Sequence, residues 1–380
     1  MTVNQIYQLL NDTAAEVYGS QAVSVLDLQG MLSLRDTVVG TGTDNFLNTL
    51  VDRIGKTVLR TLDFTSTFPK LLMNEYEFGA VLQKVSIAPF AATTQEALNV
   101  GTVGFTPDLY RIDKPTIYQD FFKDANTWTV CVTVPDVMFK TAFTSAEAMG
   151  AFITAIFDSI STSINMQLEN TSRLAIAGLV GEKINASNGV IDLVALYNTT
   201  AATPISTAAK AMIDKEFLRF AGKVMRNYIK YMAKPSVLYN IPGRVRATSR
   251  DNMHVMILTE FASACATYLE SDTFNDELVK LPYYTEVEYW QGTGASAPNF
   301  ADCSTVNIKI PSNGTVVNQS GIVGVFADRE ALAVGLYDRF SAADRNNRDR
   351  YTNYTEGCTM QSIVDTSENA LVFIVQDATP

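Results

Sequence analysis

The sequence predicts an α+β protein, and three observations indicate it. Apolar residues recur at steps of three and four between about residues 144 and 180, which is the period of one long helix. A second amphipathic stretch covers residues 207–233, and short apolar runs typical of strands lie on both sides of the two helices. With 380 residues, 47% of them hydrophobic and 18% charged, the chain is long enough for about two or three domains with a real core.

The N-terminal third combines a helical stretch, two strands and a long segment with neither pattern. Apolar residues at helical spacing follow Asp44 as far as Val58, and strands are expected at 81–88 and 128–134, each ended by a proline. Residues 89–127 between these strands contain no convincing helix. They carry six aromatic side chains, at Phe90, Phe105, Tyr110, Tyr118, Phe121 and Phe122. Aromatic side chains on so long a loop need a surface against which to be buried, and a second chain would naturally provide that surface.

The clearest helix begins at a capping box formed by Thr144 and Glu147. Its apolar positions run from Met149 to Leu179, and Gly181 follows as a C-terminal signal. About 35 residues at 1.5 Å each give a rod about 50 Å long. The pattern fits a long core helix of an α-rich domain, and it equally fits a spine that spans an elongated subunit.

A second helix is expected over residues 207–233, stopped by Pro235. Its expected inward face is Ile213, Phe217, Phe220, Val224, Tyr228 and Met232. Later strands are expected within 284–290, 306–310, 321–326 and 370–375, and residues 341–350 favour a charged, exposed loop.

Charge is distributed unevenly along the chain. The 29 basic and 40 acidic residues leave a net charge of -11, yet residues 210–250 hold ten basic residues against two acids and residues 251–290 hold eight acids against one base. Six basic residues form a stripe along the second helix: Lys215, Arg219, Lys223, Arg226, Lys230 and Lys234. Three interpretations remain open: a solvated helix face, head-to-tail packing of copies with opposite charges in contact, or a grip on nucleic acid or an acidic partner.

Sequence motifs for catalysis are absent. The chain has no Walker A motif, dinucleotide fingerprint, Gly-x-Ser-x-Gly elbow or His-Glu-x-x-His pair, and its single histidine, His254, fits a packed or surface position. We therefore expect no catalytic residues, no cofactor and no metal site. No run of about 18 apolar residues occurs, so no membrane association is expected.

Two segments and the order of the parts carry a family resemblance. They are residues 45–55, which read Asn-Phe-Leu-Asn-Thr-Leu-Val-Asp-Arg-Ile-Gly, and Lys140-Thr141-Ala142-Phe143, which lead into the long helix. Together with the order of helices and strands, they resemble the major capsid proteins of tailed bacteriophages, which have the Hong Kong 97 fold. The likeness is greatest to the small short-tailed phages of Gram-positive hosts.

The resemblance implies a division of the chain into the parts of a capsid subunit. These are an N-terminal arm (1–70), an extended loop built as a β-hairpin (71–140), a peripheral domain with a spine helix (141–200), an axial domain (201–335), a return to the peripheral domain (336–366) and a final axial strand (367–380). Some relatives cross-link a loop lysine to an asparagine. Lys84 is a conceivable donor, but nothing in the sequence supports this chemistry and we do not expect it.

The resemblance also implies the function. We expect a major capsid protein that self-assembles, as hexamers and pentamers, into an icosahedral shell around packaged double-stranded DNA, with a scaffolding protein and a portal as partners and only non-specific contact with the DNA. The six aromatic residues named above are the expected inter-subunit contacts, and Lys215, Arg219, Lys223, Arg226 and Lys230 are expected to pair charges in the axial domain. Two alternatives are an encapsulin-like nanocompartment shell and, more distantly, a soluble oligomeric enzyme with an unrecognised site.

Overall fold

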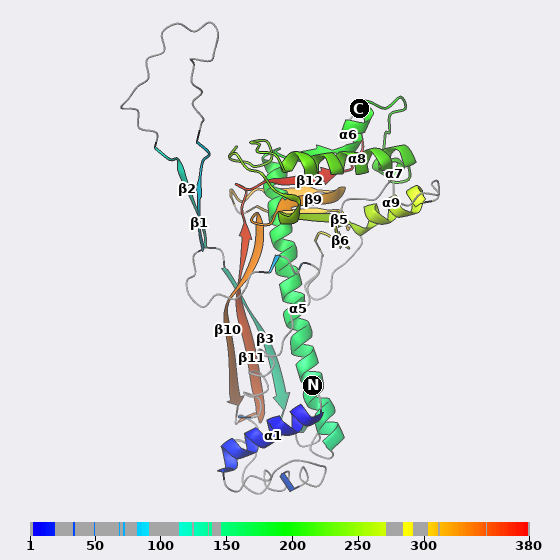
Figure 1. Ribbon diagram of the computed structural model, residues 1–380. Helices are drawn as coiled ribbons and strands as arrows, with labels where there is room; N and C mark the ends of the chain where they lie inside the picture. Colours follow the sequence, from blue (N-terminus) through cyan, green and yellow to red (C-terminus); the bar gives the residue numbers. More distant parts are fainter. Residues whose placement is uncertain are drawn as a thin grey trace. The chain divides into compact units, whose positions relative to one another are not determined.

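The computed structural model has the predicted mixed α+β character (Figure 1). It describes residues 3–19, 33–34, 49, 68, 71–72, 82–90, 114–123, 125–135, 137–138, 146–270, 284–291, 303–310, 312–346 and 348–378. The chain divides into two compact units. The first comprises Met1–Phe78, Ala125–Arg173 and Val334–Ser362, and the second comprises Gly79–Asp124, Leu174–Ala333 and Ile363–Pro380.

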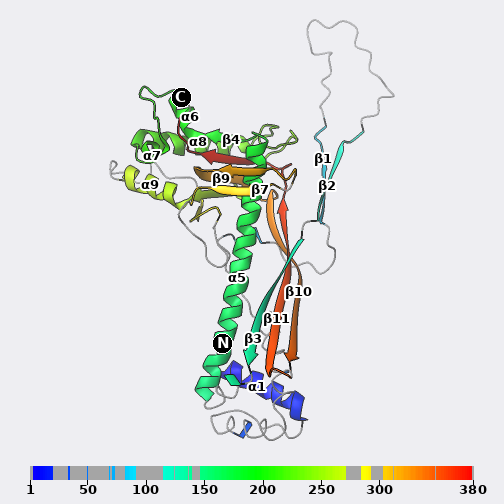
Figure 2. The ribbon, with the colours of Figure 1, turned by 180° about the vertical axis from the view of Figure 1, so that it is seen from behind.

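The first unit contains a three-stranded sheet in the order β10-β11-β3 (Figure 2). The strands are β3 (Ala125–Pro135), β10 (Leu332–Asn346) and β11 (Tyr351–Val364). The strand predicted at 128–134 lies within β3, whereas the loop expected at 341–350 is wrong as far as Asn346, where β10 ends. The charges that favoured a loop there are also typical of an edge strand, because charged side chains discourage further pairing.

The described residues of the first unit also form helices. Helix α1 spans Val3–Tyr18, and α5 spans Ala146–Asn185. Helix α5 confirms the predicted long helix, and its buried apolar side chains recur at helical spacing: Ile160, Ile164, Leu168, Ala175 and Leu179. Its residues up to Arg173 belong to the first unit and the remainder to the second. The capping residue Thr144 and nearly all of the stretch 44–58 lie outside the described residues.

The second unit is built on a five-stranded sheet in the order β4-β12-β9-β5-β6. The strands are β4 (Val190–Asp192), β5 (Met253–Leu258), β6 (Thr285–Val287), β9 (Ile322–Asp328) and β12 (Ala370–Ile374). The predicted segments 284–290, 321–326 and 370–375 contain β6, most of β9 and β12. Every residue of β5, β9 and β12 is buried, which accounts for sequences that are apolar except at His254 and Asp328. A separate pair, β7 (Val306–Lys309) and β8 (Val316–Gln319), is antiparallel.

Helices share a hydrophobic core with one face of this sheet. They are α6 (Leu193–Asn198), α8 (Lys215–Met232) and α9 (Thr259–Glu270). Phe217 of α8 and Phe261 of α9 are fully buried in this core with Phe326 and Phe373 of the sheet, whose ring centroids lie 4.6 Å apart. Large buried aromatic side chains of this kind dominate the energetics of a core.

The single helix predicted over 207–233 is two helices, α7 (Ala208–Ala211) and α8. Asp214 separates them, because its carboxylate accepts the backbone N–H of Phe217 at 2.8 Å and caps α8. Ile213, expected to face inward, lies in the intervening turn and is 58% exposed. Phe217, Val224 and Met232 are buried as expected.

Two glycines with the same φ of +73° meet different surroundings. A Cβ at Gly321 would lie 2.1 Å from the carbonyl oxygen of Val375, whose N–H donates to the Gly321 carbonyl. A Cβ at Gly314 would meet only the Lys309 side chain, at 3.2 Å. Both positions favour glycine because of their left-handed backbone, but only at Gly321 does a close backbone approach require it.

Lys183, near the end of α5, is fully buried. Its Nζ donates to the Tyr239 carbonyl at 2.7 Å and to Asn188 Oδ1 at 3.1 Å. Burial disfavours the ammonium form and lowers the pKa of Lys183 to about 7. This lysine therefore links the end of α5 to the segment that follows α8.

Candidate functional site

The second unit contains a β-hairpin formed by β1 (Leu82–Ile87) and β2 (Ile117–Phe122). The strands are antiparallel, with Leu82 opposite Phe122 and Ile87 opposite Ile117. Strand β1 confirms the prediction at 81–88, and β2 lies in the segment for which no element was expected. The hairpin falls within the range 71–140, but β3 in the same range pairs with β11 in the first unit. The range assigned to the extended loop is thus divided between the two units.

One face of the hairpin, here called the outer face, is apolar and exposed. Its residues alternate along both strands, and four of them remain about half exposed: Val85 (55%), Ile87 (54%), Ile117 (54%) and Phe121 (54%). Phe90, three residues beyond β1, is 67% exposed. A cluster of exposed apolar side chains on two paired strands is typical of an interaction surface.

The opposite, inner face of the hairpin carries a charged lysine. Lys84 Nζ lies 2.8 Å from a carboxylate oxygen of Glu368, 2.9 Å from Asp365 and 3.0 Å from Glu330. Burial by itself would lower the pKa of Lys84, but the bonds to these three carboxylates outweigh it and raise the pKa above its usual value. Burial also raises the pKa of Glu368, an effect that the bond from Lys84 opposes. We therefore take the Lys84 side chain to be a charged ammonium group that is paired with three carboxylates.

Two arginines hold the inner face from the segment after α8. Arg244 donates two hydrogen bonds to the Asp120 carboxylate, at 2.6 and 3.1 Å, and its guanidinium lies 4.3 Å from the centre of the Tyr118 ring. The bond from Arg244 lowers the pKa of Asp120. Arg246 donates to Ser86 Oγ at 2.9 Å and lies 3.0 Å from Glu368. A bidentate arginine–carboxylate pair fixes both distance and orientation.

A buried amide side chain, that of Asn240, positions Arg244. The Asn240 side chain accepts the Arg244 N–H and donates to the Arg244 carbonyl, both at 2.7 Å. Its Nδ2 also lies 3.4 Å from Asn369 Oδ1 in the segment that holds Glu368. Sequence reasoning missed this network because its members lie far apart along the chain: 281 residues separate Lys84 from Asp365.

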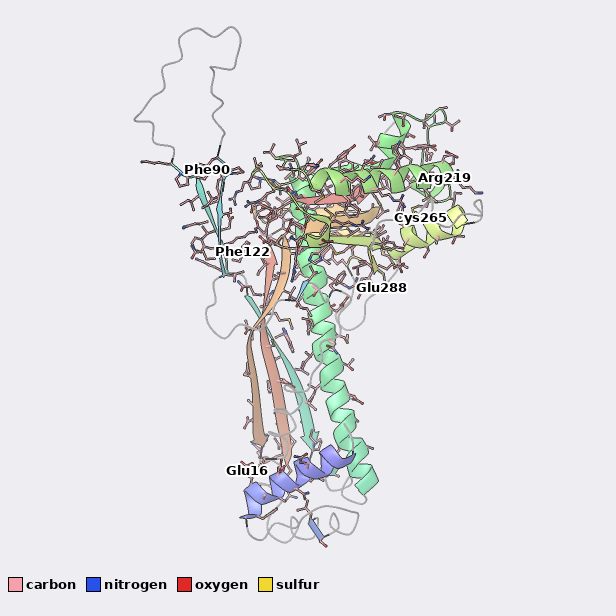
Figure 3. The ribbon with its side chains drawn as sticks, viewed as in Figure 1. Glu16, Phe90, Phe122, Arg219, Cys265 and Glu288 are labelled. Atoms are coloured by element: carbon pink, nitrogen blue, oxygen red, sulfur yellow. The ribbon has the colours of Figure 1, made fainter. Side chains whose placement is uncertain are left out.

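The predicted aromatic contacts fall on both faces of the hairpin. Phe90 and Phe121 are exposed, whereas Tyr118 and Phe122 are half-buried on the inner face. Figure 3 shows Phe90 and Phe122 at opposite ends of the hairpin. Phe105 and Tyr110 lie outside the described residues.

The predicted basic stripe runs along α8, on which Figure 3 marks Arg219. Lys223 and Lys230 are exposed, and the other members within α8 are half-buried: Lys215, Arg219 and Arg226. Arg219 Nη1 lies 3.4 Å from Glu216. From the acidic block, Asp251, Glu260, Glu286 and Glu288 are exposed, while residues 271–283 lie outside the described part of the chain.

Metal binding in the described part of the chain can be judged from its histidine, cysteine and carboxylate side chains. Within it, no group of three or more His, Cys, Asp and Glu side chains is arranged to hold a metal ion. His254 is buried in β5, opposite Ala327. In the same residues, no helix combines the length and the apolar character needed to cross a membrane. The outer face of the hairpin and the basic stripe of α8 are the two candidate contact surfaces.

Comparison with known proteins decides the family. The model of the Phi29-like phage major capsid protein family matches residues 12–374. The chain belongs to this family. None of the curated proteins matches it.

Solved structures agree on the fold of this phage major capsid protein. A chain in the capsid of Staphylococcus phage Andhra has 11% sequence identity and a TM-score of 0.51, covering 82% of this chain and 84% of that one. A chain in the structure of head fiber and inner core protein gp22 of native bacteriophage P68 has 12% identity and a TM-score of 0.53, covering 82% and 85%. The predicted resemblance to capsid proteins of the Hong Kong 97 type is confirmed.

The family assignment decides among the three functions that the sequence left open. The protein is a structural component of the phage virion that forms the icosahedral head. Because the family is structural, the enzyme alternative is excluded. The phage family likewise decides against the nanocompartment alternative.

Proposed function

We propose that the outer face of the β1–β2 hairpin is a surface by which one capsid subunit contacts the next. Copies of this chain surround each subunit in a capsid, so a second copy is the expected occupant of an exposed apolar face. The observation that carries the proposal is the alternation itself. Val85, Ile87, Ile117 and Phe121 gather on one face and remain about half exposed, while the inner face is occupied by contacts within the subunit.

The proposal keeps Phe90 and Phe121 as the leading aromatic contacts. Both are more than half exposed, so each has apolar area that a neighbour can bury. Tyr118 already lies under Arg244, so its contribution to a subunit contact is expected to be indirect. Phe105, Tyr110 and Phe122 stay predictions.

We further propose that α8 contributes charge pairing within capsomers of five or six subunits. The exposed Lys223 and Lys230 would face acids of a neighbouring copy, such as Glu286 and Glu288. Contacts between unlike faces of identical subunits close into rings. Complementary charges also suppress wrong encounters and set the register of contact.

The two units and the hairpin would each take the role of one part of a capsid subunit. The first unit, with most of α5, would serve as the peripheral domain; the five-stranded sheet with its helices would serve as the axial domain, with the hairpin as the extended loop. Partners beyond the chain itself would be a scaffolding protein, a portal and the packaged double-stranded DNA. A net charge of -11 supports only non-specific contact with DNA.

Site-specific photo-cross-linking tests the hairpin contact. Phe121 is replaced by p-benzoylphenylalanine, and assembled shells are irradiated and then dissociated. We expect chains joined in pairs, with the second attachment point on a different subunit. The matched control places the same photoreactive residue at Phe122, its neighbour on the inner face, where attachment within one chain should predominate. Equal yields of paired chains from the two positions, or none from Phe121, would refute the assignment of the outer face.

A further inference from the structure

The inner face of the hairpin carries three polar side chains among Leu82, Tyr118 and Phe122, which is unusual for the side of a strand pair that lies against its own subunit. Lys84, Ser86 and Asp120 point toward the rest of the second unit, to which the hairpin belongs, while Val85 and Ile87 face outward. A hairpin of two strands has little stability of its own in water, and an apolar inner face is the usual means of attaching one. Here charged contacts take a large part in the attachment.

The charges across this contact are arranged with opposite polarity on the two sides. Lys84 and Asp120 stand directly opposite each other in the hairpin register, so the hairpin presents one cation beside one anion. The body of the subunit presents acids to Lys84 and the Arg244 guanidinium to Asp120. Turning or sliding the hairpin so that these two groups exchange places would set like charges against each other, which is strongly unfavourable.

Burial strengthens these contacts. The exposed fraction of the side chain is 19% for Lys84, 4% for Asp365 and 8% for Glu368. For Arg244 and Asp120 it is 14% and 26%. Partly buried pairs are screened by salt far less than surface pairs, so this contact should survive at physiological ionic strength.

We infer that Lys84 and Asp120 are positioning residues, which lock the hairpin in one orientation on its own subunit so that the outer face is presented to the neighbouring copy. The inference rests on the proposed function of the outer face, and it adds a specific device. The charged clamp, defined as Lys84 with its three acids and Asp120 with Arg244, sets where the apolar face points. Its role is to order the hairpin before assembly. It does so without using the apolar side chains of the outer face, which stay available for the subunit contact.

Hydrogen exchange in the soluble, unassembled subunit tests the clamp directly. Lys84→Met removes the charge at nearly constant length, and Lys84→Arg keeps the charge as the matched control. We expect amide exchange of β1 and β2 to be at least about tenfold faster in Lys84→Met than in the wild type, with β12 unchanged. Lys84→Arg should restore slow exchange. Asp120→Asn, which weakens the bond to Arg244 from the hairpin side, provides a second variant if Lys84→Met does not fold.

Electron microscopy of shells assembled from the same variants completes the test. We expect the Lys84→Met subunit to yield mainly open or irregular particles and the Lys84→Arg subunit to yield closed shells. Unchanged exchange in β1 and β2, or closed shells from a subunit whose hairpin has been released, would overturn the clamp. Neither result alters the photo-cross-linking outcome at Phe121, which tests the proposed contact separately.

Discussion

Replacing Ile117 and Phe121 together with serine should weaken the subunit contact by an amount that the structure sets. Complete burial of a large apolar side chain is worth about 2.5 kcal/mol. Each of these two side chains is 54% exposed in the subunit, which leaves about 1.3 kcal/mol each to be gained on assembly. The pair therefore contributes about 2.6 kcal/mol per contact, equivalent to about a 100-fold change in the association constant. Because each subunit has one outer face, the critical concentration for shell assembly should rise by about the same factor.

Light scattering across a range of subunit concentrations measures that threshold, and electron microscopy identifies the particles. Gln119→Ser is the matched control, because Gln119 lies between the two sites on the same outer face and its replacement removes little apolar area. The same arithmetic assigns about 1.2 kcal/mol to the buried part of each side chain, so the unassembled double variant should unfold at a lower temperature but remain folded, whereas Gln119→Ser should be nearly unchanged. A double variant that assembles at the wild-type threshold would refute the reasoning.

Three further changes test the subunit and the capsomer. Gly321→Ala should lower the free energy of unfolding, measured in urea, by about 3 kcal/mol and Gly314→Ala by about 1 kcal/mol. Both glycines have φ +73°, but only a Cβ at Gly321 would meet a carbonyl oxygen. Equal losses in the two variants would contradict this reasoning. Lys183→Met should abolish a rise in wild-type stability between pH 7 and 10.5, since the folded lysine is neutral above about pH 7 while the unfolded one stays protonated. That rise is at most about 1.4 kcal/mol per pH unit, and a flat wild-type profile would argue against it. The double variant Lys223→Glu, Lys230→Glu should reduce the yield of closed shells about tenfold at low salt, and adding Glu286→Lys to it should partly restore that yield. A yield that neither change affects would exclude charge pairing by α8.

The long helix was predictable from the sequence because its signal is local. Side chains three and four residues apart share a helix face, so α5 follows from the spacing of its apolar residues alone. The break before α8 was also within reach, because Asp214 is a favoured capping residue with the first buried apolar side chain three positions later. The end of β10 could not be predicted from the sequence, because alternating charges on an edge strand resemble those of an exposed loop.

The hairpin shows why the site itself was harder to predict than the fold. In β1, Lys84 and Ser86 alternate with Val85 and Ile87, and the usual inference from such a pattern places the apolar pair inside. The structure has the reverse arrangement. The polar side chains point inward because Glu330, Asp365 and Glu368, all more than 240 residues away in the sequence, converge on Lys84, a contact that local periodicity does not contain. The sequence did indicate that this segment needs a second chain, because it carries more aromatic side chains than a long loop can bury by itself. The inverted face gives that expectation a direction: the subunit satisfies the polar side of the hairpin and leaves the apolar side for another copy.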